Sequence, residues 1–286
     1  MAAPHLFKHA HADVGDVTLH YVTAGEGPAV VLLRGWPQTW YMWRDVIPGL
    51  AQRYRVIAPD LRGLGDSSRP ADGYDKKTVA EDIWRLVHNV LHEQWLFVVG
   101  HDWGGPTAFA LAAQHREAVR RVAIFDVPVP GDGTPVFHNS RWHHGFHWEV
   151  DLPEALTAGR EELYLGFFYR AWGARPDAIS EKAQREYLRT YCQPGAMRAG
   201  FNLYRAMRQD VVDNEAFTAQ GKLQMPVLCY GGSQGRGRGQ LAIESWRRVA
   251  NDVRGGVAEN CGHWIPEERP DWVVEQLAAF FGEEQV

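Results

Sequence analysis

Short apolar runs recur along the chain and alternate with stretches of helical periodicity. Seven runs rich in β-branched and aromatic residues predict strands: VTLHYV, PAVVLL, YRVIAPD, WLFVVGH, VRRVAIFDV, PVLCYGG and GGVAEN. Between two of them, the segment AEDIWRLVHNVLH places one apolar helical face on Ile83, Leu86, Val87, Val90 and Leu91, and TAFALAAQH has a similar period. Strands that alternate with helices predict an α/β protein with a largely parallel sheet.

The pattern changes in the middle of the chain, where strand-like runs disappear. Helical, aromatic-rich segments such as REELYLGFFYRAW and EKAQREYLRTY dominate there, and QMPVLCYGG then resumes the strand pattern. A chain that leaves a sheet and returns to it predicts an inserted unit. We therefore expect a core made of residues 1–130 and 221–286, with residues 131–220 as a helical cap.

Composition and charge narrow the function classes. The chain has 286 residues, enough to bury a full apolar core, and a net charge of −5 that is spread without blocks. We therefore expect a small-molecule substrate as the partner, and neither nucleic acid nor a membrane. The start MAAPHLFKHAHADVGDV has no apolar segment behind a basic one, which predicts a cytoplasmic protein. The three cysteines have neither CxxC nor zinc-like spacing and are expected to be reduced and mostly buried.

One turn carries the first chemical signal. The run WLFVV is followed by Gly100, His101, Asp102, Trp103 and Gly104, and then by a helical segment. A strand, a Gly-x-nucleophile-x-Gly turn and a helix form a nucleophile elbow, whose tight turn leaves no room for a side chain at either glycine. The pentapeptide alone is a weak pattern, and its place between a strand and a helix makes it specific. Here Asp102 stands where a serine is usual.

The elbow and two further segments carry a family resemblance. With RGWPQTWYMWRDVIPGLAQRYRVIAPDLRGLGDSS upstream and NCGHWIPEERP near the end, nearly the whole chain resembles the α/β-hydrolase superfamily. Within it, the closest resemblance is to the Asp-nucleophile branch of epoxide hydrolases and dehalogenases. The resemblance implies an α/β-hydrolase fold: a mostly parallel, eight-stranded sheet with a helical cap inserted after the sixth strand. A ligand would then bind between core and cap, at the carboxyl ends of the strands.

A carboxylate nucleophile determines the expected chemistry. It attacks an alkyl carbon and becomes an ester whose carbonyl belongs to the enzyme, so that water can regenerate the acid. His263, after the last strand-like run, stands where the superfamily keeps its histidine and is the expected general base. Of the two family positions for the orienting carboxylate, CYGGSQGRGRG contains no acid, and the other holds Asp126, 24 residues beyond Asp102. Asp126 is the expected third member, with a turn-capping aspartate as the alternative.

The oxyanion hole is expected to consist of two backbone N–H groups. By the resemblance these belong to Trp103 and to Trp36, in the first strand-to-helix loop. That loop departs from the usual His-Gly-x-Pro, because it reads RGWP and begins with Arg34. We expect this arginine to pair with a nearby carboxylate such as Asp60 or Asp66.

The cap indicates which leaving group is stabilised. RWHHGFHW and FNLYRAM resemble segments of bacterial epoxide hydrolases of the cystic-fibrosis transmembrane-regulator inhibitory factor type, whose triad acid is often glutamate. In those enzymes a histidine and a tyrosine hold the epoxide oxygen, which implies His143 and Tyr204 here. His144 is the alternative histidine, and aromatic packing is the alternative role for Tyr204. The leading expectation is an epoxide hydrolase that forms a vicinal diol.

Dehalogenation by the same nucleophile is the main alternative. Fluoroacetate dehalogenases would require arginines just after the nucleophile, where this chain has Trp103 and Pro106. Haloalkane dehalogenases use an elbow tryptophan like Trp103 as a halide donor, but their second donor, often an asparagine, is replaced by Trp36. A non-catalytic receptor of the same fold is a weaker alternative, because all three triad positions hold competent residues.

No metal and no cofactor is expected. His143 and His147 stand four residues apart, and His5, His9 and His11 form a second group. The glutamate of an HExxH motif is absent, and the second group falls in a segment expected to be a flexible tail. GRGRG lacks the ending of a phosphate loop and is typical of a solvated loop. Family analogy alone allows a homodimer.

Overall fold

Eight strands form a single mixed sheet in a computed structural model that describes residues 6–134 and 141–283. The spatial order is β1-β2-β4-β3-β5-β6-β7-β8. The strands are β1 (Lys8–Asp13), β2 (Thr18–Ala24), β3 (Ala29–Arg34), β4 (Arg55–Pro59), β5 (Leu96–His101), β6 (Val119–Phe125), β7 (Val227–Gly232) and β8 (Val253–Ala258). β2 pairs antiparallel with β1 and β4, and every other neighbouring pair is parallel. The predicted mostly parallel, eight-stranded sheet is confirmed.

The strand that the apolar pattern missed is β1, at the edge of the sheet. Its sequence KHAHAD alternates polar and small residues, and Ala12 is its one buried position. The edge strand has no second neighbour and little core to cover, so its sequence lacks the apolar run of a central strand. His9 and His11 lie in β1, so the expectation of a flexible tail is wrong for them; His5 lies outside the described residues.

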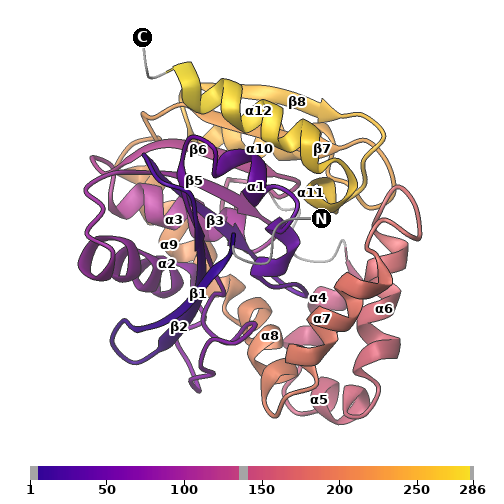
Figure 1. Ribbon diagram of the computed structural model, residues 1–286. Coiled ribbons are helices and arrows are strands. Elements are labelled where there is room, and N and C mark those ends of the chain that lie inside the picture. The colour runs from indigo at the N-terminus through magenta and orange to yellow at the C-terminus, as the bar shows by residue number, and fades with distance from the viewer. Residues whose placement is uncertain (1–5, 135–140, 284–286) are drawn as a thin grey trace.

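Helices cover both faces of the sheet (Figure 1). Side chains of β3 alternate between two apolar clusters, with Val31 and Leu33 in one and Val30 and Leu32 in the other, as expected for a strand buried on both faces. The first cluster includes side chains from α2 (Lys76–Trp84), α3 (Gly104–Gln114) and α10 (Gln240–Val249). The second includes side chains from the short helices η1 (Trp40–Trp43) and α1 (Ile47–Leu50) and from α12 (Pro270–Gly282).

The helix predicted over residues 80–92 is not regular throughout. α2 continues into a π-helical segment, η2 (Arg85–Val90). Ile83, Leu86 and Val87 are fully buried as predicted, whereas Val90 is 36% exposed. The wider π turn shifts the phase of the residues that follow it, which turns Val90 away from the core.

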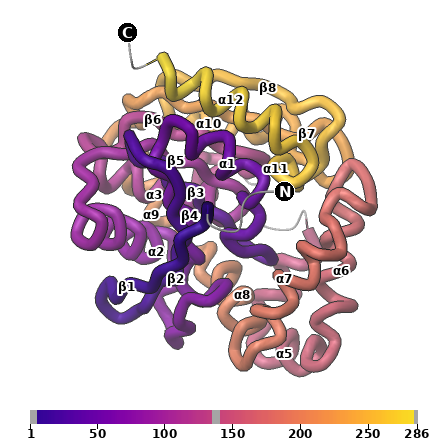
Figure 2. The backbone as a smooth tube through the Cα atoms, in the orientation of Figure 1, coloured from indigo at the N-terminus to yellow at the C-terminus, as the bar shows by residue number. Residues whose placement is uncertain are grey.

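The described elements between β6 and β7 are helices joined by loops, apart from an isolated β-bridge at Leu223. The helices are α4 (Trp142–Trp148), α5 (Leu152–Thr157), α6 (Glu161–Ala171), α7 (Glu181–Tyr191), α8 (Ala196–Arg205) and α9 (Met207–Ala219). α4 to α8 form a lobe beside the sheet, and the chain then returns along α9, which packs on α2 and α3 (Figures 1 and 2). α7 contacts η1, the helix that follows β3, so the lobe lies at the end of the sheet where β3 finishes.

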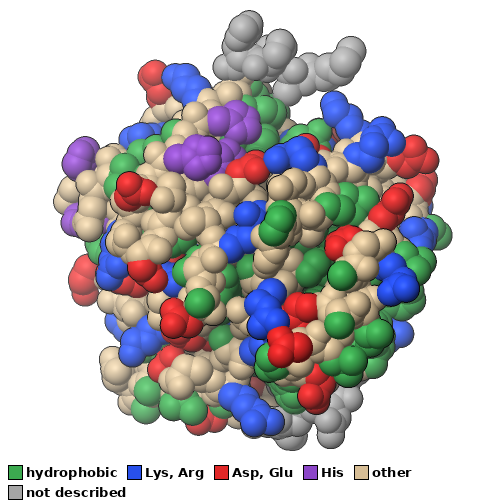
Figure 3. Space-filling view, turned by 90° about the horizontal axis from the view of Figure 1, so that it is seen from below, with side chains coloured by type: hydrophobic (Ala, Val, Ile, Leu, Met, Phe, Trp, Pro, Cys, Tyr) green, Lys and Arg blue, Asp and Glu red, His purple; other side chains and the backbone are tan. Residues whose placement is uncertain are grey.

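The surface and the thiols add two observations. Acidic and basic side chains are interspersed on the face shown in Figure 3, and no described helix has the length and apolar character needed to span a membrane. All three cysteines are unpaired, and Cys229 and Cys261 are buried as expected, while Cys192 is exposed.

Candidate active site

Asp102 occupies the tip of a tight turn between β5 and α3. Its φ angle is +52°, a left-handed conformation that is costly for a residue other than glycine and is typical of a nucleophile elbow. A Cβ at Gly100 would lie 2.5 Å from the carbonyl oxygen of Gly104, and one at Gly104 would lie 2.3 Å from that of Leu33. The close approach of β5, α3 and β3 therefore requires both glycines, as the sequence predicts.

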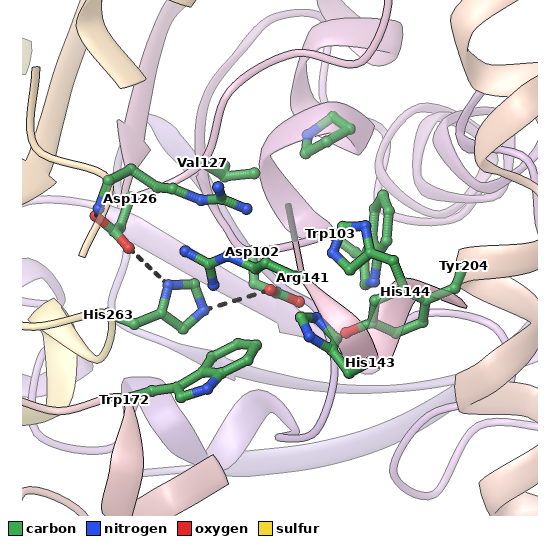
Figure 4. Close-up of a pocket in the computed structure, with 12 residues that line it drawn as sticks. Asp102, Trp103, Asp126, Val127, Arg141, His143, His144, Trp172, Tyr204 and His263 are labelled. Atoms are coloured by element: carbon green, nitrogen blue, oxygen red, sulfur yellow. Dashed lines mark hydrogen bonds and ion pairs between the residues drawn. The ribbon is translucent and has the colours of Figure 1, made fainter. Parts of the chain in front are cut away.

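The three predicted triad residues lie in one row (Figure 4). His263 Nδ1 is 2.7 Å from Asp126 Oδ2, and His263 Nε2 is 3.4 Å from Asp102 Oδ2. The other oxygen of Asp126 accepts backbone N–H groups from Gly232 at 2.7 Å and Arg238 at 2.6 Å. Asp126 is thus both an orienting carboxylate for His263 and a cap for the loop after β7.

Both backbone polar groups of His263, the N–H and the carbonyl oxygen, are hydrogen-bonded. Its N–H donates to the carbonyl oxygen of Trp172 at 2.8 Å, and its carbonyl oxygen lies 2.5 Å from Nε2 of His101. The Trp172 ring stands edge-on to the imidazole, with the ring centroids 5.1 Å apart. Burial lowers the pKa of His101, so this histidine is a neutral donor. Neither Trp172 nor His101 is assigned a role by the sequence patterns.

Arg34 lies beside Asp102 and not beside the carboxylates expected for it. Its Nη1 is 3.6 Å from Asp102 Oδ1, and its Nε donates to Gln38 Oε1 at 2.6 Å. Asp60 is bonded instead to a histidine of β2, and Asp66 to an arginine of α7, so the predicted pairing is wrong. The side chain of Arg34 is buried, which places a permanent positive charge behind Asp102.

The surroundings of Asp102 favour its ionised form. Burial on its own raises the pKa of this carboxyl, but the contact with His263 and the charge of Arg34 outweigh it and hold the pKa below its usual value. Asp102 is therefore a carboxylate at neutral pH, and a carboxylate is a far stronger nucleophile than the neutral acid.

The turn after β3 packs directly on the elbow. A Cβ at Gly35 would lie 2.4 Å from Asp102 Oδ1 and 2.3 Å from the amide nitrogen of Trp103. The backbone next to Trp36 and that of Trp103 therefore border the same carboxylate oxygen. The assignment of their N–H groups to the oxyanion hole stays a prediction, which this close approach allows.

The lobe brings the predicted leaving-group residues to the other side of Asp102. His143 and His144 come from α4 and Tyr204 from α8, and all three line one cavity with Asp102. Figure 4 shows the His143 ring and the Tyr204 side chain beside the Asp102 carboxylate, while His144 lies nearer the Trp103 ring. The ring of Tyr204 stands edge-to-face with Trp103, at a centroid distance of 4.9 Å.

Three lobe side chains at the cavity, Tyr204, His143 and His144, are neutral hydrogen-bond donors. Burial raises the pKa of Tyr204 well above its usual value. Burial also lowers the pKa of His143 far below its usual range and that of His144 to about 3. At neutral pH the cavity thus holds an un-ionised phenol and neutral imidazoles opposite a carboxylate.

His147, one of the histidines considered as a metal ligand, contacts a tyrosine and a tryptophan. His147 Nε2 is 2.6 Å from the hydroxyl of Tyr164, and its ring packs on Trp36. Among the described residues, the group with metal-like spacing is instead His20, Asp60 and Asp66. The His20 and Asp60 side chains of that group already bond each other at 2.8 Å.

The cavity lies between the sheet and the lobe and has a volume of about 380 Å³, its open mouth included. Its wall consists of Asp102, Trp103, Pro106, Asp126, Val127, Arg141, His143, His144, Trp172, Tyr204, Arg238 and His263. Two arginines of this wall are not predicted from the sequence. The interpretation of GRGRG as a solvated loop is wrong for Arg238, and Arg141 directly precedes α4. The loop after β7 could have indicated Arg238, since it follows the carboxyl end of a central strand.

Comparison with known proteins identifies a matching family and several similar chains. Residues 28–270 match the family described as alpha/beta hydrolase fold. The chain is 41% identical to "Soluble epoxide hydrolase" of Corynebacterium sp. (strain C12), with 96% of each chain covered. It is 31% identical to "Fluoroacetate dehalogenase" of Burkholderia sp, covering 97% of this chain and 94% of the relative. The crystal structure of wild-type Cfl2 from Burkholderia cenocepacia superposes with a TM-score of 0.92 at 38% identity, with 98% of each chain covered.

Proposed function

The chain belongs to the α/β-hydrolase fold family as an epoxide hydrolase-like member, and from this premise we propose that it converts a small epoxide to a vicinal diol through an ester of Asp102. The observation that carries the proposal is the arrangement around one cavity. A carboxylate on a nucleophile elbow faces Tyr204 and His143, while His263 and Asp126 lie behind it. Two neutral donors opposite a carboxylate suit a substrate that develops an alkoxide.

In the first step, an oxygen of Asp102 attacks an epoxide carbon and the ring C–O bond breaks. The electron pair of that bond moves to the ring oxygen, which Tyr204 and His143 stabilise by O–H and N–H donation. This oxygen then takes one proton from solvent, and the Asp102 acid returns one proton to solvent when the second step regenerates the carboxylate. Tyr204 and His143 are neutral at pH 7, so they can donate to the oxygen without pairing with Asp102 as cations would. The product of this step is a hydroxyalkyl ester of Asp102.

In the second step, His263 removes a proton from a water molecule that attacks the carboxyl carbon of the ester. Asp126 stabilises the imidazolium through the 2.7 Å contact with Nδ1. The N–H groups of Trp36 and Trp103 hold the oxyanion until it collapses and expels the diol as an alkoxide, which regains the proton from His263. The sum of both steps is the addition of one water molecule to the epoxide.

Dehalogenation is the second candidate, favoured by one observation. The indole N–H of Trp103 is buried and has no well-aligned acceptor among the described residues, and such a donor also suits a departing halide. The relative named fluoroacetate dehalogenase points the same way. Both candidates use the same Asp102 ester, so they differ in the group that leaves carbon.

A substrate panel tests the proposal directly. The enzyme is incubated with small epoxides, bromoalkanes and haloacetates, and the release of diol and of halide is measured for each. We expect diol from epoxides at rates well above those of a heat-inactivated sample. Halide release without any diol from the epoxides would overturn the proposed function in favour of dehalogenation.

Substitution of the oxygen-binding residues should separate their roles. We expect Tyr204→Phe and His143→Phe each to lower kcat on an epoxide by roughly 10- to 1000-fold, because each removes one donor to the developing alkoxide. The matched His144→Phe variant should lose less, since Figure 4 places His144 nearer Trp103 than the nucleophile. A larger loss in His144→Phe than in His143→Phe would exchange the two assignments.

Replacement of Arg34 should alter the pH dependence of the reaction. Asp102 must be ionised to attack, and Arg34 is one of the groups that hold its pKa low. In Arg34→His the pKa of Asp102 should rise, so the acidic limb of the kcat/KM profile should move to higher pH by roughly 1 to 3 units. Arg34→Lys, which keeps the charge, should move it less.

The exposed Arg189 provides the control for this profile. It pairs with Asp66 at the surface, so Arg189→Gln should leave the acidic limb in place. Thermal unfolding of each variant shows whether the fold is retained. An unchanged acidic limb in a folded Arg34→His enzyme would mean that Arg34 does not control the ionisation of Asp102.

A further inference from the structure

Two arginines from different parts of the chain line the cavity. Arg141 comes from the lobe, and Arg238 comes from the core loop between β7 and α10. Both side chains line the same cavity wall as Asp102. Arg141 donates through Nη2 to a backbone carbonyl oxygen, that of Arg236, at 2.9 Å, and its guanidinium lies 5.0 Å from the Trp172 ring centroid. Within the described residues, neither guanidinium has a carboxylate within 4.0 Å.

The acids of the cavity are already occupied by other groups. Asp126 contacts His263 and accepts two backbone N–H groups, one of which is the amide of Arg238 itself. Asp102 lies between His263 and Arg34. The side-chain charges of Arg141 and Arg238 are therefore not neutralised by a direct ion pair with either acid.

Partial burial disfavours the charged form of both arginines. Burial and, to a smaller extent, the nearby charge of Arg238 together lower the pKa of Arg141 to about 10. Burial likewise lowers the pKa of Arg238. Both stay charged at neutral pH, and a bound anion would offset the cost of desolvation and of their mutual repulsion.

We propose that Arg141 and Arg238 bind the carboxylate of the substrate, and that the substrate is a small epoxide with a carboxylate directly attached to the ring, a 2,3-epoxy acid. This inference rests on the proposed epoxide hydrolysis and names its substrate class. The guanidinium fork matches a carboxylate in a planar, bidentate geometry. The two arginines lie in the same cavity wall as Asp102, so a carboxylate attached directly to the epoxide ring can contact them while a ring carbon lies at Asp102.

The same arginines reduce the electrostatic repulsion between such a substrate and the active-site carboxylate. Asp102 is negative, and it would repel an anion that approaches it in a cavity with little water. Two guanidinium groups in the same wall offset that repulsion and orient the ring carbon towards Asp102. The reaction is balanced without any further reactant, since 2,3-epoxypropanoate and water yield 2,3-dihydroxypropanoate.

The test compares two epoxides of nearly the same shape. Glycidate carries the carboxylate, and glycidamide replaces it by a neutral amide. We expect kcat/KM for glycidate to exceed that for glycidamide by at least tenfold in the unmodified enzyme. In Arg238→Gln this ratio should fall by at least tenfold, and Arg238→Lys should restore part of it, because a single charge without the fork binds a carboxylate less well.

The ratio within each variant separates recognition from a general loss of activity. A variant with a distorted site loses both substrates together and keeps the ratio. The matched control is Arg236→Gln, which removes an exposed charge from the same loop two residues away and should keep the ratio of the unmodified enzyme. Thermal unfolding with and without 2,3-dihydroxypropanoate gives a second measurement, and this product should stabilise the unmodified enzyme more than Arg238→Gln.

The outcomes distinguish the two proposals. Hydrolysis of both epoxides with a ratio near one, or a ratio that Arg238→Gln leaves unchanged, overturns the carboxylate site and leaves epoxide hydrolysis standing. If neither epoxide is hydrolysed and haloacetates release halide, the proposed function is wrong and the epoxy-acid substrate with it. Stabilisation by 2,3-dihydroxypropanoate that is equal in the unmodified enzyme and Arg238→Gln would also contradict the role of the arginine.

Discussion

The Asp102→Asn enzyme is expected to fold and to lose epoxide turnover by roughly 10⁴-fold or more, the range seen when a nucleophile is removed. The amide keeps the volume of the side chain but is a poor nucleophile towards carbon. Asparagine also tolerates the left-handed backbone of position 102, where φ is +52°, better than most residues. The loss should therefore report on chemistry and not on the geometry of the elbow.

The measurement is the initial rate of diol formation, with circular dichroism and thermal unfolding to show that the variant is folded. Arg34 is buried 3.6 Å from Asp102, so loss of the negative charge is expected to lower the unfolding temperature, and the variant should still unfold in one cooperative transition. Turnover within tenfold of the unmodified enzyme would exclude Asp102 as the nucleophile.

Oxygen-18 labelling of the unmodified enzyme provides the complementary experiment. In a single turnover in labelled water, with enzyme in excess, the oxygen transferred to the substrate should come unlabelled from Asp102. The label should appear in the peptide that contains Asp102. Label in the diol after that first turnover would contradict a covalent ester and indicate direct attack by water.

The second large effect is expected for His263→Gln, which should trap the ester. His263 is needed for the attack of water but not for the attack on the epoxide, so the first step should continue and the second should slow by about 10²- to 10⁴-fold. One equivalent of epoxide should be consumed rapidly, and steady turnover should then nearly cease. The intact protein should gain the mass of one epoxide molecule.

Peptide mapping locates the added mass, which is expected on Asp102. The control is Asp126→Asn, which keeps His263 but removes the carboxylate 2.7 Å from its Nδ1, and which should slow the same step. Loss of turnover in His263→Gln with no added mass would mean that His263 acts before the ester forms.

The sequence predicted those parts of the molecule that are formed by residues that follow one another in the chain. A central strand of a parallel sheet is buried on both faces, so β3, β5 and β6 appear as nearly continuous apolar runs. The elbow at Asp102 is equally local, because its strand, turn, glycines and helix follow one another in the chain. By contrast, β1 was missed, since an edge strand needs no such run.

Contacts between distant segments were decided by the tertiary structure alone. Arg34 and Asp102 are separated by 67 residues, and only the parallel pairing of β3 with β5 brings their ends together. Arg141 and Arg238 meet at the cavity because the lobe closes over the loop after β7, and no periodicity in either segment records that approach. The sequence by itself determined the elbow and with it the candidate nucleophile, Asp102, since a strand–turn–helix depends on short-range backbone geometry. The charge around Asp102 depends on distances through space, and only the packed chain sets those distances.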